Sequence, residues 1–396
     1  MTVRSRIVLV ALAILGCVCG TALAAYISST STGVSTFTTR AVTSKPVITG
    51  VRITSDPTCA VGTPVDTVRQ GGDFYACVNS VTDVAGIASV TADLGGINGD
   101  TAVPLNTSGG PFSGYQYRSA VQAAGSPLET GTSGAWSIKA TNNNGDRSTL
   151  SGNTFNIRSY DGLLRGEFGA AATANVAQYY RLSDTGTTAA NVGSGGTATL
   201  TYNGTPTRRV DGANVGSTDQ AVRLNGTTDY LSGNRLGAIA SNYSLEIWIK
   251  GSASSGGGTG TVWSNSAGII DAGSAASNND FGLALDATGR LVAGCGNGAT
   301  IRSNAGALSD GEWHHVVFTR VRTSGAIELF LDGVSVANAT TCNTTAHTGS
   351  TTIWLGRSHE SNLYLTGADL DQAALYSRVI TAAEVLDHYN LGLGLE

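Results

Sequence analysis

The chain has 396 residues, of which 13% are charged, and its formal net charge at pH 7 is -5. Because no run of Lys or Arg follows the first few residues, the chain lacks the basic patch that captures nucleic acid, so nucleic acid is not expected as a partner. The length predicts two or three domains, each large enough to bury its own core.

The N-terminus is typical of an export signal. Two arginines precede an apolar run from Ile7 to Leu15, and Ala22-Leu23-Ala24 supplies the small residues at which signal peptidases cut. Since the apolar run extends to about 18 weakly polar residues, an uncleaved membrane anchor is the alternative. We expect residues 1–24 to be a signal peptide or N-terminal membrane anchor and residues 25–45 to be a flexible Ser/Thr-rich stalk. The protein is then extracellular or held at the cell surface.

Residues 46–159 are expected to form an immunoglobulin-like β-sandwich. Short apolar runs alternate with Gly, Asn and Ser clusters, which is the spacing of all-β sandwiches. The segments Val81–Val90 and Trp136–Asp146 resemble bacterial immunoglobulin-like repeats of surface proteins, and this resemblance implies a spacer domain. The expected strands are Val47 to Ile53, Phe74 to Val78, Ile87 to Leu94, Tyr115 to Val121, Trp136 to Ala140 and Thr154 to Ile157.

After a connection expected at residues 160–174, a larger all-β domain is predicted from 175 to 391. Ser244–Lys250 alternates with the period of two that a strand requires. Two later strands are joined by Asp332-Gly333, a pair that favours a type I′ hairpin turn. Near the end, Thr381-Ala382-Ala383-Glu384 has the pattern of a capping box and predicts one short helix.

Several motifs follow one another in this domain. They are Ala221–Leu231, Ser244–Lys250, Gly268–Ala272, Asn279–Leu285, Asp310–Arg320, Leu329–Gly333, Ile353–Ser358 and Leu375–Val385. In this order they resemble the laminin-G-like, or concanavalin A-like, jelly-roll family. The resemblance implies a jelly roll of two antiparallel sheets, usually in an extracellular protein that binds glycans or other proteins, often with one calcium ion on the rim.

Four cysteines follow the expected signal: Cys59, Cys77, Cys295 and Cys342. In an oxidising compartment an even number predicts disulfides, and a metal site is disfavoured because no C-x-x-C spacing is present. Four cysteines allow three pairings. If each pair stays inside its own domain, Cys59 pairs with Cys77 and Cys295 with Cys342.

Calcium is the one cofactor that the residue types indicate. The ion prefers several oxygen ligands, and Asp271, Asn279 and Asp280 lie close together on an expected rim loop. Asp371 is a further candidate, although the family commonly has Asp-Glu-Val where this chain has Asp371-Gln372-Ala373, so one acidic ligand is missing. The alternative is that these residues only turn the chain.

The aromatic residues offer platforms on which a sugar ring can stack. Trp263 lies beside a Gly-rich loop, and it and Tyr364 are the candidate ligand-binding aromatics, although core packing is the favoured interpretation for both. Trp248, Trp313 and Trp354 lie within expected strands and are expected in the core.

The histidines do not suggest a catalytic centre. His314 and His315 are adjacent on an expected strand, so their side chains point to opposite faces and cannot converge on one metal ion. His347, His359 and His388 stand alone, and we expect them at the surface or at helix caps.

The expected function is binding rather than catalysis. Jelly-roll glucanases carry paired carboxylates as Glu-x-Asp-x-Glu on one strand, and this string does not occur, while Glu246 and Glu328 are expected to be solvated. We therefore predict an exported binding or adhesion protein whose jelly roll recognises a glycan or a protein. A structural or self-assembling surface protein, with sheet edges that pair with copies of themselves, is the alternative, and a carbohydrate-active enzyme is the third class.

Overall fold

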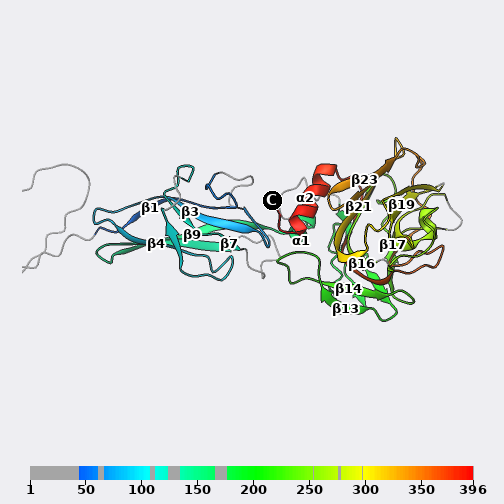
Figure 1. Ribbon diagram of the computed structural model, residues 1–396, viewed down its shortest axis with the longest axis horizontal. Coiled ribbons are helices and arrows are strands. Elements are labelled where there is room, and N and C mark those ends of the chain that lie inside the picture. Colours follow the sequence, from blue (N-terminus) through cyan, green and yellow to red (C-terminus); the bar gives the residue numbers. More distant parts are fainter. Residues whose placement is uncertain are drawn as a thin grey trace, which may run out of the picture. The chain divides into compact units, whose positions relative to one another are not determined.

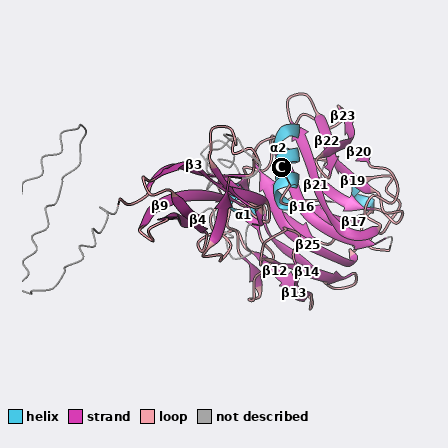
Figure 2. Ribbon diagram, turned by 60° about the vertical axis from the view of Figure 1, so that its left-hand side comes forward, coloured by secondary structure: helices cyan, strands magenta, loops and turns pink. Residues whose placement is uncertain are grey.

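The computed structural model describes residues 44–60, 67–107, 112–123, 134–165, 176–252, 254–274, 278–296 and 298–395, and it is built almost entirely of strands (Figure 1, Figure 2). The expected signal or anchor at 1–24 lies outside these residues, as does nearly all of the expected stalk at 25–45. Among the described residues, no helix has both the length and the apolar character needed to cross a membrane.

The N-terminal part is a β-domain with its own hydrophobic core. Its strands run in the order β1-β3-β6-β5-β4-β8-β9-β2, with β7 beside β3, and only β2 and β9 pair in parallel. Trp136, Ile138 and Phe74 are among the buried core residues. The strands are β1 (Val47–Thr54), β2 (Thr67–Arg69), β3 (Asp73–Thr82), β4 (Ile87–Asp93), β5 (Val103–Asn106), β6 (Tyr117–Ser119), β7 (Gln122–Ala123), β8 (Gly134–Asn142) and β9 (Arg147–Arg158).

The predicted all-β character of this part is confirmed, whereas its immunoglobulin-like arrangement stays a prediction. Period-two alternation explains the strands: in β4 the buried residues Val90 and Ala92 alternate with more exposed neighbours. The predicted disulfide between Cys59 and Cys77 is present, and it packs against the buried ring of Phe112.

The C-terminal part contains two sheets of eight strands each. The first, here called the β16 sheet, has the order β13-β14-β25-β16-β21-β22-β23, with β10 beside β25. Its strands are β10 (Val176–Tyr180), β13 (Thr207–Asp211), β14 (Gln220–Asn225), β16 (Tyr243–Ser252), β21 (Asp310–Val321), β22 (Ala326–Leu331), β23 (Val334–Ala339) and β25 (Thr366–Tyr376).

The second sheet, here called the β17 sheet, has the order β11-β12-β15-β24-β17-β18-β19-β20. Its strands are β11 (Thr188–Ala189), β12 (Leu200–Asn203), β15 (Tyr230–Asn234), β17 (Ala267–Asp271), β18 (Phe281–Leu285), β19 (Leu291–Cys295), β20 (Ala299–Arg302) and β24 (Thr352–Leu355). The short helix η1 (Trp263–Asn265) precedes β17.

The core of this domain lies between the two sheets, as the predicted jelly roll requires. Leu245, Ile247 and Ile249 of β16 are fully buried there, and they share one face of the strand as the sequence pattern predicted. The predicted hairpin is also confirmed. Asp332 and Gly333 have φ values of 52° and 78°, the positive values that a type I′ turn needs at both central residues.

Two helices cover the outer face of the β16 sheet. They are α1 (Tyr160–Leu164), which lies in the stretch expected to connect the domains, and α2 (Ala382–Gly392), which begins with the predicted capping box of Thr381 and Glu384. Figure 1 shows both helices against β16 and β21. All five residues of α1 are buried, so the described part of the expected connection is not a free linker.

A buried carboxylate ties both helices to the sheet. Glu246 of β16 accepts hydrogen bonds from the Tyr160 hydroxyl at 2.6 Å, from Nε2 of His315 at 2.7 Å and from the Tyr376 hydroxyl. Its two carboxylate oxygens lie 3.0 and 3.1 Å from Nδ1 of His388 in α2. The predictions that Glu246 is solvated and that His388 is a surface or cap residue were therefore wrong, because the helices cover this face.

The charges in this network support one another. Burial alone would raise the pKa of Glu246, but the charge of His388 and the hydrogen bonds from both imidazoles hold that pKa well below its ordinary value. Burial opposes the charge on His388 as well, and the neighbouring Glu246 raises the pKa of this imidazole above its ordinary value. The result is a hydrogen-bonded ion pair beneath the C-terminal helix.

We predict that Glu246→Gln lowers the free energy of unfolding by about 3 kcal/mol, because the amide leaves buried donors without their charged acceptor. Denaturant unfolding of the full chain measures this change. Glu328→Gln is the matched control, since Glu328 lies on a strand of the same sheet, is half-buried and accepts one hydrogen bond from Ser335. A Glu246→Gln variant no less stable than this control would contradict the role given to the network.

Candidate functional site

Two buried aspartates lie together at one end of the β17 sheet. Asp271 is the last residue of β17, and Asp280 immediately precedes β18. These strands form an antiparallel pair in which Asp271 lies opposite Gly282, so the hairpin brings both carboxyl groups to the same end. Only 1% of Asp271 and 4% of Asp280 are exposed. The sequence-based expectation that these two residues lie close together agrees with this geometry.

A third carboxyl group joins them from a loop far along the chain. Glu360 lies between β24 and β25, and its carboxyl group is close enough to Asp271 and Asp280 to raise the pKa of both. Burial, and then the charge of Glu360, raise the pKa of Asp271 to about 7. Burial and the contact with Glu360 likewise raise the pKa of Asp280 to about 7. Asp271 and Asp280 therefore keep their protons up to about neutral pH.

Backbone donors already point at these carboxyl groups. The Gly273 N–H donates to Oδ1 of Asp271 at 2.6 Å, and the Ser274 N–H donates to Oδ2 of Asp280 at 3.1 Å. These bonds favour the charged carboxylates, whereas burial and mutual repulsion oppose them. A hard cation would relieve the repulsion, and oxygen ligands are the kind that calcium prefers.

The cluster fits calcium in its chemistry, although its carboxyl groups are not tightly gathered. Within the described ranges, one group of three His, Cys or acidic residues has its ligand atoms within 4.8 Å of one another, and that group is Cys295, Cys342 and His347. The carboxyl groups of Asp271, Asp280 and Glu360 are more widely spaced. Binding of calcium to Asp271, Asp280 and Glu360 thus requires their side chains to move closer together.

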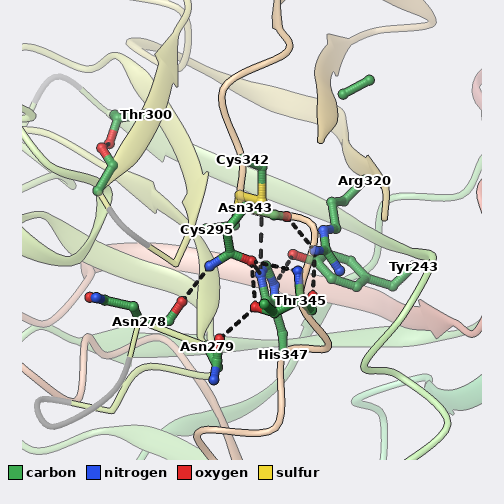
Figure 3. Close-up of a disulfide and its surroundings, with 12 residues drawn as sticks. Tyr243, Asn278, Asn279, Cys295, Thr300, Arg320, Cys342, Asn343, Thr345 and His347 are labelled. Carbon is green, nitrogen blue, oxygen red and sulfur yellow. Dashed lines mark hydrogen bonds between the residues drawn. A yellow bond between two sulfur atoms is a disulfide. The ribbon is translucent and has the colours of Figure 1, made fainter. Parts of the chain in front are cut away.

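The structure does not bring the other two expected ligands to this cluster. The amide oxygen of Asn279 accepts a hydrogen bond from Thr345 at 2.7 Å, so it is engaged with a different loop (Figure 3). Asp371 lies in β25 of the other sheet, where it is fully buried and its Oδ2 accepts the Ala213 N–H at 2.7 Å. Asp371 and Asp271 thus belong to different sheets, so Asp371 is not a ligand of this cluster, and its candidacy as a separate calcium ligand stays a prediction.

Trp263 is not an exposed platform, and the favoured interpretation of core packing is confirmed for it. The residue is only 2% exposed, in η1. Its indole lies flat against two glycines: a Cβ added to Gly282 or Gly294 would come within 2.3 or 2.4 Å of the ring. The glycines let the indole approach the sheet, so Trp263 is part of the packing.

Tyr364 is half-buried and belongs to a surface group of aromatic and cationic side chains. Its ring meets that of Tyr230 edge-on, with the centroids 6.1 Å apart. The Arg357 guanidinium lies over both rings, 4.9 Å from the centroid of Tyr230 and 5.3 Å from that of Tyr364. Sequence analysis identified Tyr364 but not its two partners, which are contributed by another strand and by the start of the same loop.

Trp354 was expected in the core, but the structure shows that it is half-buried. It is the strand partner of Asp271 across β24 and β17. Its indole stacks on the exposed imidazole of His359, with centroids 4.2 Å apart and planes inclined by 8°. The expected surface position of His359 is confirmed.

A single loop, residues 356–365 between β24 and β25, therefore carries His359, Glu360 and Tyr364. We call the group formed by Asp271, Asp280, Glu360, Trp354, His359 and Tyr364 the rim site. Within this group, Trp354 lies opposite Asp271 in the sheet and stacks on His359, whereas Tyr364 lies further along the same loop, against Tyr230 and Arg357.

The remaining histidines are not members of the rim site. His314 contacts Asp310 and Asp332, whereas the neighbouring His315 contacts Glu246, so the two imidazoles do point apart as expected. His347 was expected at the surface but is fully buried, because its ring packs against Tyr243 and Phe281.

Comparison with known proteins yields a family match for the C-terminal part. Residues 225–386 match the family model described as the concanavalin A-like lectin/glucanases superfamily. No curated protein matches the chain.

Solved structures similar to the chain include a toxin domain, a neurotoxin domain and a sialidase. The binding domain of Paraclostridial Mosquitocidal Protein 1 is 14% identical, with 55% of this chain and 52% of that chain covered and a TM-score of 0.42. The receptor-binding domain of botulinum neurotoxin C/D mosaic serotype is 15% identical, with 54% and 50% covered and a TM-score of 0.40. Trypanosoma rangeli sialidase is 12% identical, with 66% and 42% covered and a TM-score of 0.42. The chain spans about half the length of the toxin domains.

We predict that Asp271→Asn stabilises the calcium-free protein at pH 8. The pKa of Asp271 is raised from 3.8 to about 7, so its contribution to stability is present below pH 3.8 and is lost as the pH rises through 7. Asparagine keeps the shape and removes the charge, and we expect a gain of about 4 kcal/mol at pH 8 and little change at pH 4. Thermal and denaturant unfolding with chelator present measure both values.

Asp229→Asn is the control for this substitution. Asp229 is also buried, and it accepts the backbone N–H groups of Thr205 at 2.8 Å and Asn225 at 3.1 Å. Asparagine keeps only one of the two acceptor oxygens, and the loss of the other should destabilise the protein at both pH values. An Asp271→Asn variant that behaves like this control would contradict the charge repulsion inferred at the rim site.

Proposed function

We propose, from the premise that the C-terminal domain belongs to the concanavalin A-like lectin/glucanases superfamily, that the chain is an exported, non-catalytic binding protein. In this proposal the rim site recognises a glycan with the help of a bound calcium ion. The observation that carries the proposal is the loop at 356–365, which joins Glu360 of the carboxyl cluster to His359 and Tyr364 of the aromatic groups.

Each half of the rim site suits one feature of a sugar. A pyranose ring has an apolar face that stacks on aromatic side chains, and the half-buried rings of Tyr364 and Tyr230 with exposed His359 offer such surfaces. Sugar hydroxyl groups are oxygen ligands, so they can complete the coordination of a calcium ion held by Asp271, Asp280 and Glu360. A ligand that contacts both halves is held in one orientation.

The same geometry supports a binding role over glycoside hydrolysis. Hydrolases place their two carboxyl groups about 5 to 9.5 Å apart, so that the sugar and a nucleophile fit between them. Asp271 and Asp280 are instead buried, with 1% and 4% of their surfaces exposed, so their carboxyl groups do not line an open cleft in which a glycosidic bond could lie between them.

Export is the second part of the proposal. Its supports are the apolar N-terminal run and the two disulfides, Cys59–Cys77 and Cys295–Cys342, which form and persist in oxidising compartments. Attachment to the membrane, if it occurs, is proposed to involve only the N-terminal segment.

We predict that the full chain binds a subset of glycans in a glycan-array screen with calcium and loses this binding with chelator. Asp280→Asn should abolish the effect of calcium, because it removes one charged ligand. Tyr364→Ala should weaken binding about tenfold, which corresponds to the loss of one aromatic contact. The full chain is used because α1 supplies Tyr160 to the buried network of the jelly roll.

Trp313→Ala provides the matched control. Trp313 is a half-buried tryptophan on the other sheet, where it lines a surface hollow with Lys250 and Asp369. The proposal expects this substitution to leave glycan binding unchanged. Binding that is lost in Trp313→Ala and retained in Tyr364→Ala would place the ligand on the β16 sheet and contradict the rim site.

A further inference from the structure

The disulfide between Cys295 and Cys342 lies beside a buried histidine (Figure 3). Cys295 is the last residue of β19 in the β17 sheet, and Cys342 follows β23 of the β16 sheet, so the bond links the two sheets. His347 lies five residues after Cys342, with its Nε2 3.8 Å from the Cys342 sulfur. One ligand atom from each of the three residues lies within 4.8 Å of the others.

The imidazole of His347 is held in one orientation and kept neutral. Its Nδ1 lies 3.0 Å from the Tyr243 hydroxyl, which directs Nε2 toward the sulfur and toward Oδ1 of Asn343 at 3.0 Å. Burial, with the positive charges of Arg320 and Arg235, lowers the pKa of His347 to about 3. Because Oδ1 of Asn343 can only accept, Nε2 carries the proton while the disulfide is intact. Metal binding through Nε2 requires the other neutral tautomer, in which the Nδ1–H donates to the Tyr243 hydroxyl and Nε2 has a free lone pair.

We propose that, once this disulfide is reduced, Cys295, Cys342 and His347 bind one zinc ion. Two equivalents of a thiol reductant convert the disulfide into two protein thiols and are themselves oxidised to a disulfide. Zinc then displaces two protons, one from each thiol, and forms two bonds to sulfur and one to Nε2 of His347. Oδ1 of Asn343 or a water molecule completes the four ligands that zinc prefers.

The spacing of the ligand atoms fits this ion. Zinc–sulfur bonds of about 2.3 Å and zinc–nitrogen bonds of about 2.0 Å place the two ligand atoms of a tetrahedral site about 3.6 Å apart. The observed separation between the Cys342 sulfur and Nε2 of His347 is 3.8 Å. Reduction frees the two sulfurs to separate, and the ion can then lie between them and the imidazole.

The charges around the site favour thiolates. The Arg320 guanidinium donates to the carbonyl oxygens of Asn343 at 2.6 Å and Thr345 at 2.7 Å, which places a positive charge beside the loop that carries Cys342. A nearby guanidinium lowers the pKa of a thiol, and the thiolate is the form that binds metal. Two thiolates with one zinc ion are neutral together, so the guanidinium does not repel the filled site.

The site is distinct in chemistry from the rim site. Sulfur and imidazole ligands select zinc, whereas the carboxylates of the rim site suit calcium. The other disulfide also differs: Cys59 and Cys77 pack against Phe112, Tyr75 and Tyr115, and no His accompanies them within the described residues of that cluster. Cys59–Cys77 therefore serves as an internal control, because it is a cysteine pair without a neighbouring histidine.

Cobalt(II) titration of the full chain tests the proposal, because thiolate-to-cobalt charge-transfer absorption reports sulfur ligation directly. The protein is reduced with a phosphine under nitrogen, freed of reductant and titrated, and zinc is then added to displace cobalt. We expect one equivalent of cobalt with a sulfur band in the reduced protein and none in the oxidised protein. His347→Ala should weaken binding roughly 100-fold or more, and Tyr243→Phe, which removes only the supporting hydrogen bond, about tenfold.

Two control variants complete the experiment. His359→Ala removes an exposed imidazole elsewhere and should leave the titration unchanged. The double variant Cys59→Ser/Cys77→Ser should retain the sulfur band, and if it fails to fold, the His347→Ala comparison in the parent chain still decides the question. A reduced protein without a sulfur band, or one whose band and affinity survive His347→Ala, would overturn the proposal.

Discussion

Two buried aspartates beside a third carboxyl group set the constraint on which the rim of the jelly roll depends. The pairing of β17 with β18 fixes Asp271 and Asp280 at one end of the sheet, and the loop at 356–365 adds Glu360. Because burial and repulsion raise the pKa of both aspartates to about 7, the cluster is under electrostatic tension at neutral pH. A bound cation would relieve this repulsion, and the loop that carries Glu360 also carries His359 and Tyr364.

The disulfide region supports this rim. The Asn343 side chain donates to the carbonyl oxygen of Asn278 at 2.6 Å, and the Gly296 N–H donates to the carbonyl oxygen of Asp280 at 2.7 Å. Both donors adjoin the cysteines of the Cys295–Cys342 bond, so the backbone that carries Asp280 is braced by the link between the sheets (Figure 3). Reduction of this disulfide and metal binding there would therefore shift the backbone that carries Asp280.

Local patterns predicted the strands of the jelly roll, the Asp332-Gly333 hairpin and the capping box at Thr381, because turn chemistry and strand period depend on neighbouring residues. The sequence also predicted that Asp271 and Asp280 lie near each other, because these two residues are close along the chain. Glu360 escaped prediction because it reaches the cluster from a distant loop. Glu246 was misread because its strand position predicts a solvated side chain, and only the packing of α1 and α2 shows that this face is a second core.

Calorimetric titration of calcium into the full chain at pH 7, in two buffers with different ionisation enthalpies, tests the central claim most directly. The buffer dependence of the heat gives the number of protons released. Because Asp271 and Asp280 hold protons with pKa values of about 7, calcium bound at the rim site must displace part of them. The account predicts one calcium ion per chain with proton release that is reduced in Asp271→Asn. Absence of calcium binding, or binding without proton release, would contradict it.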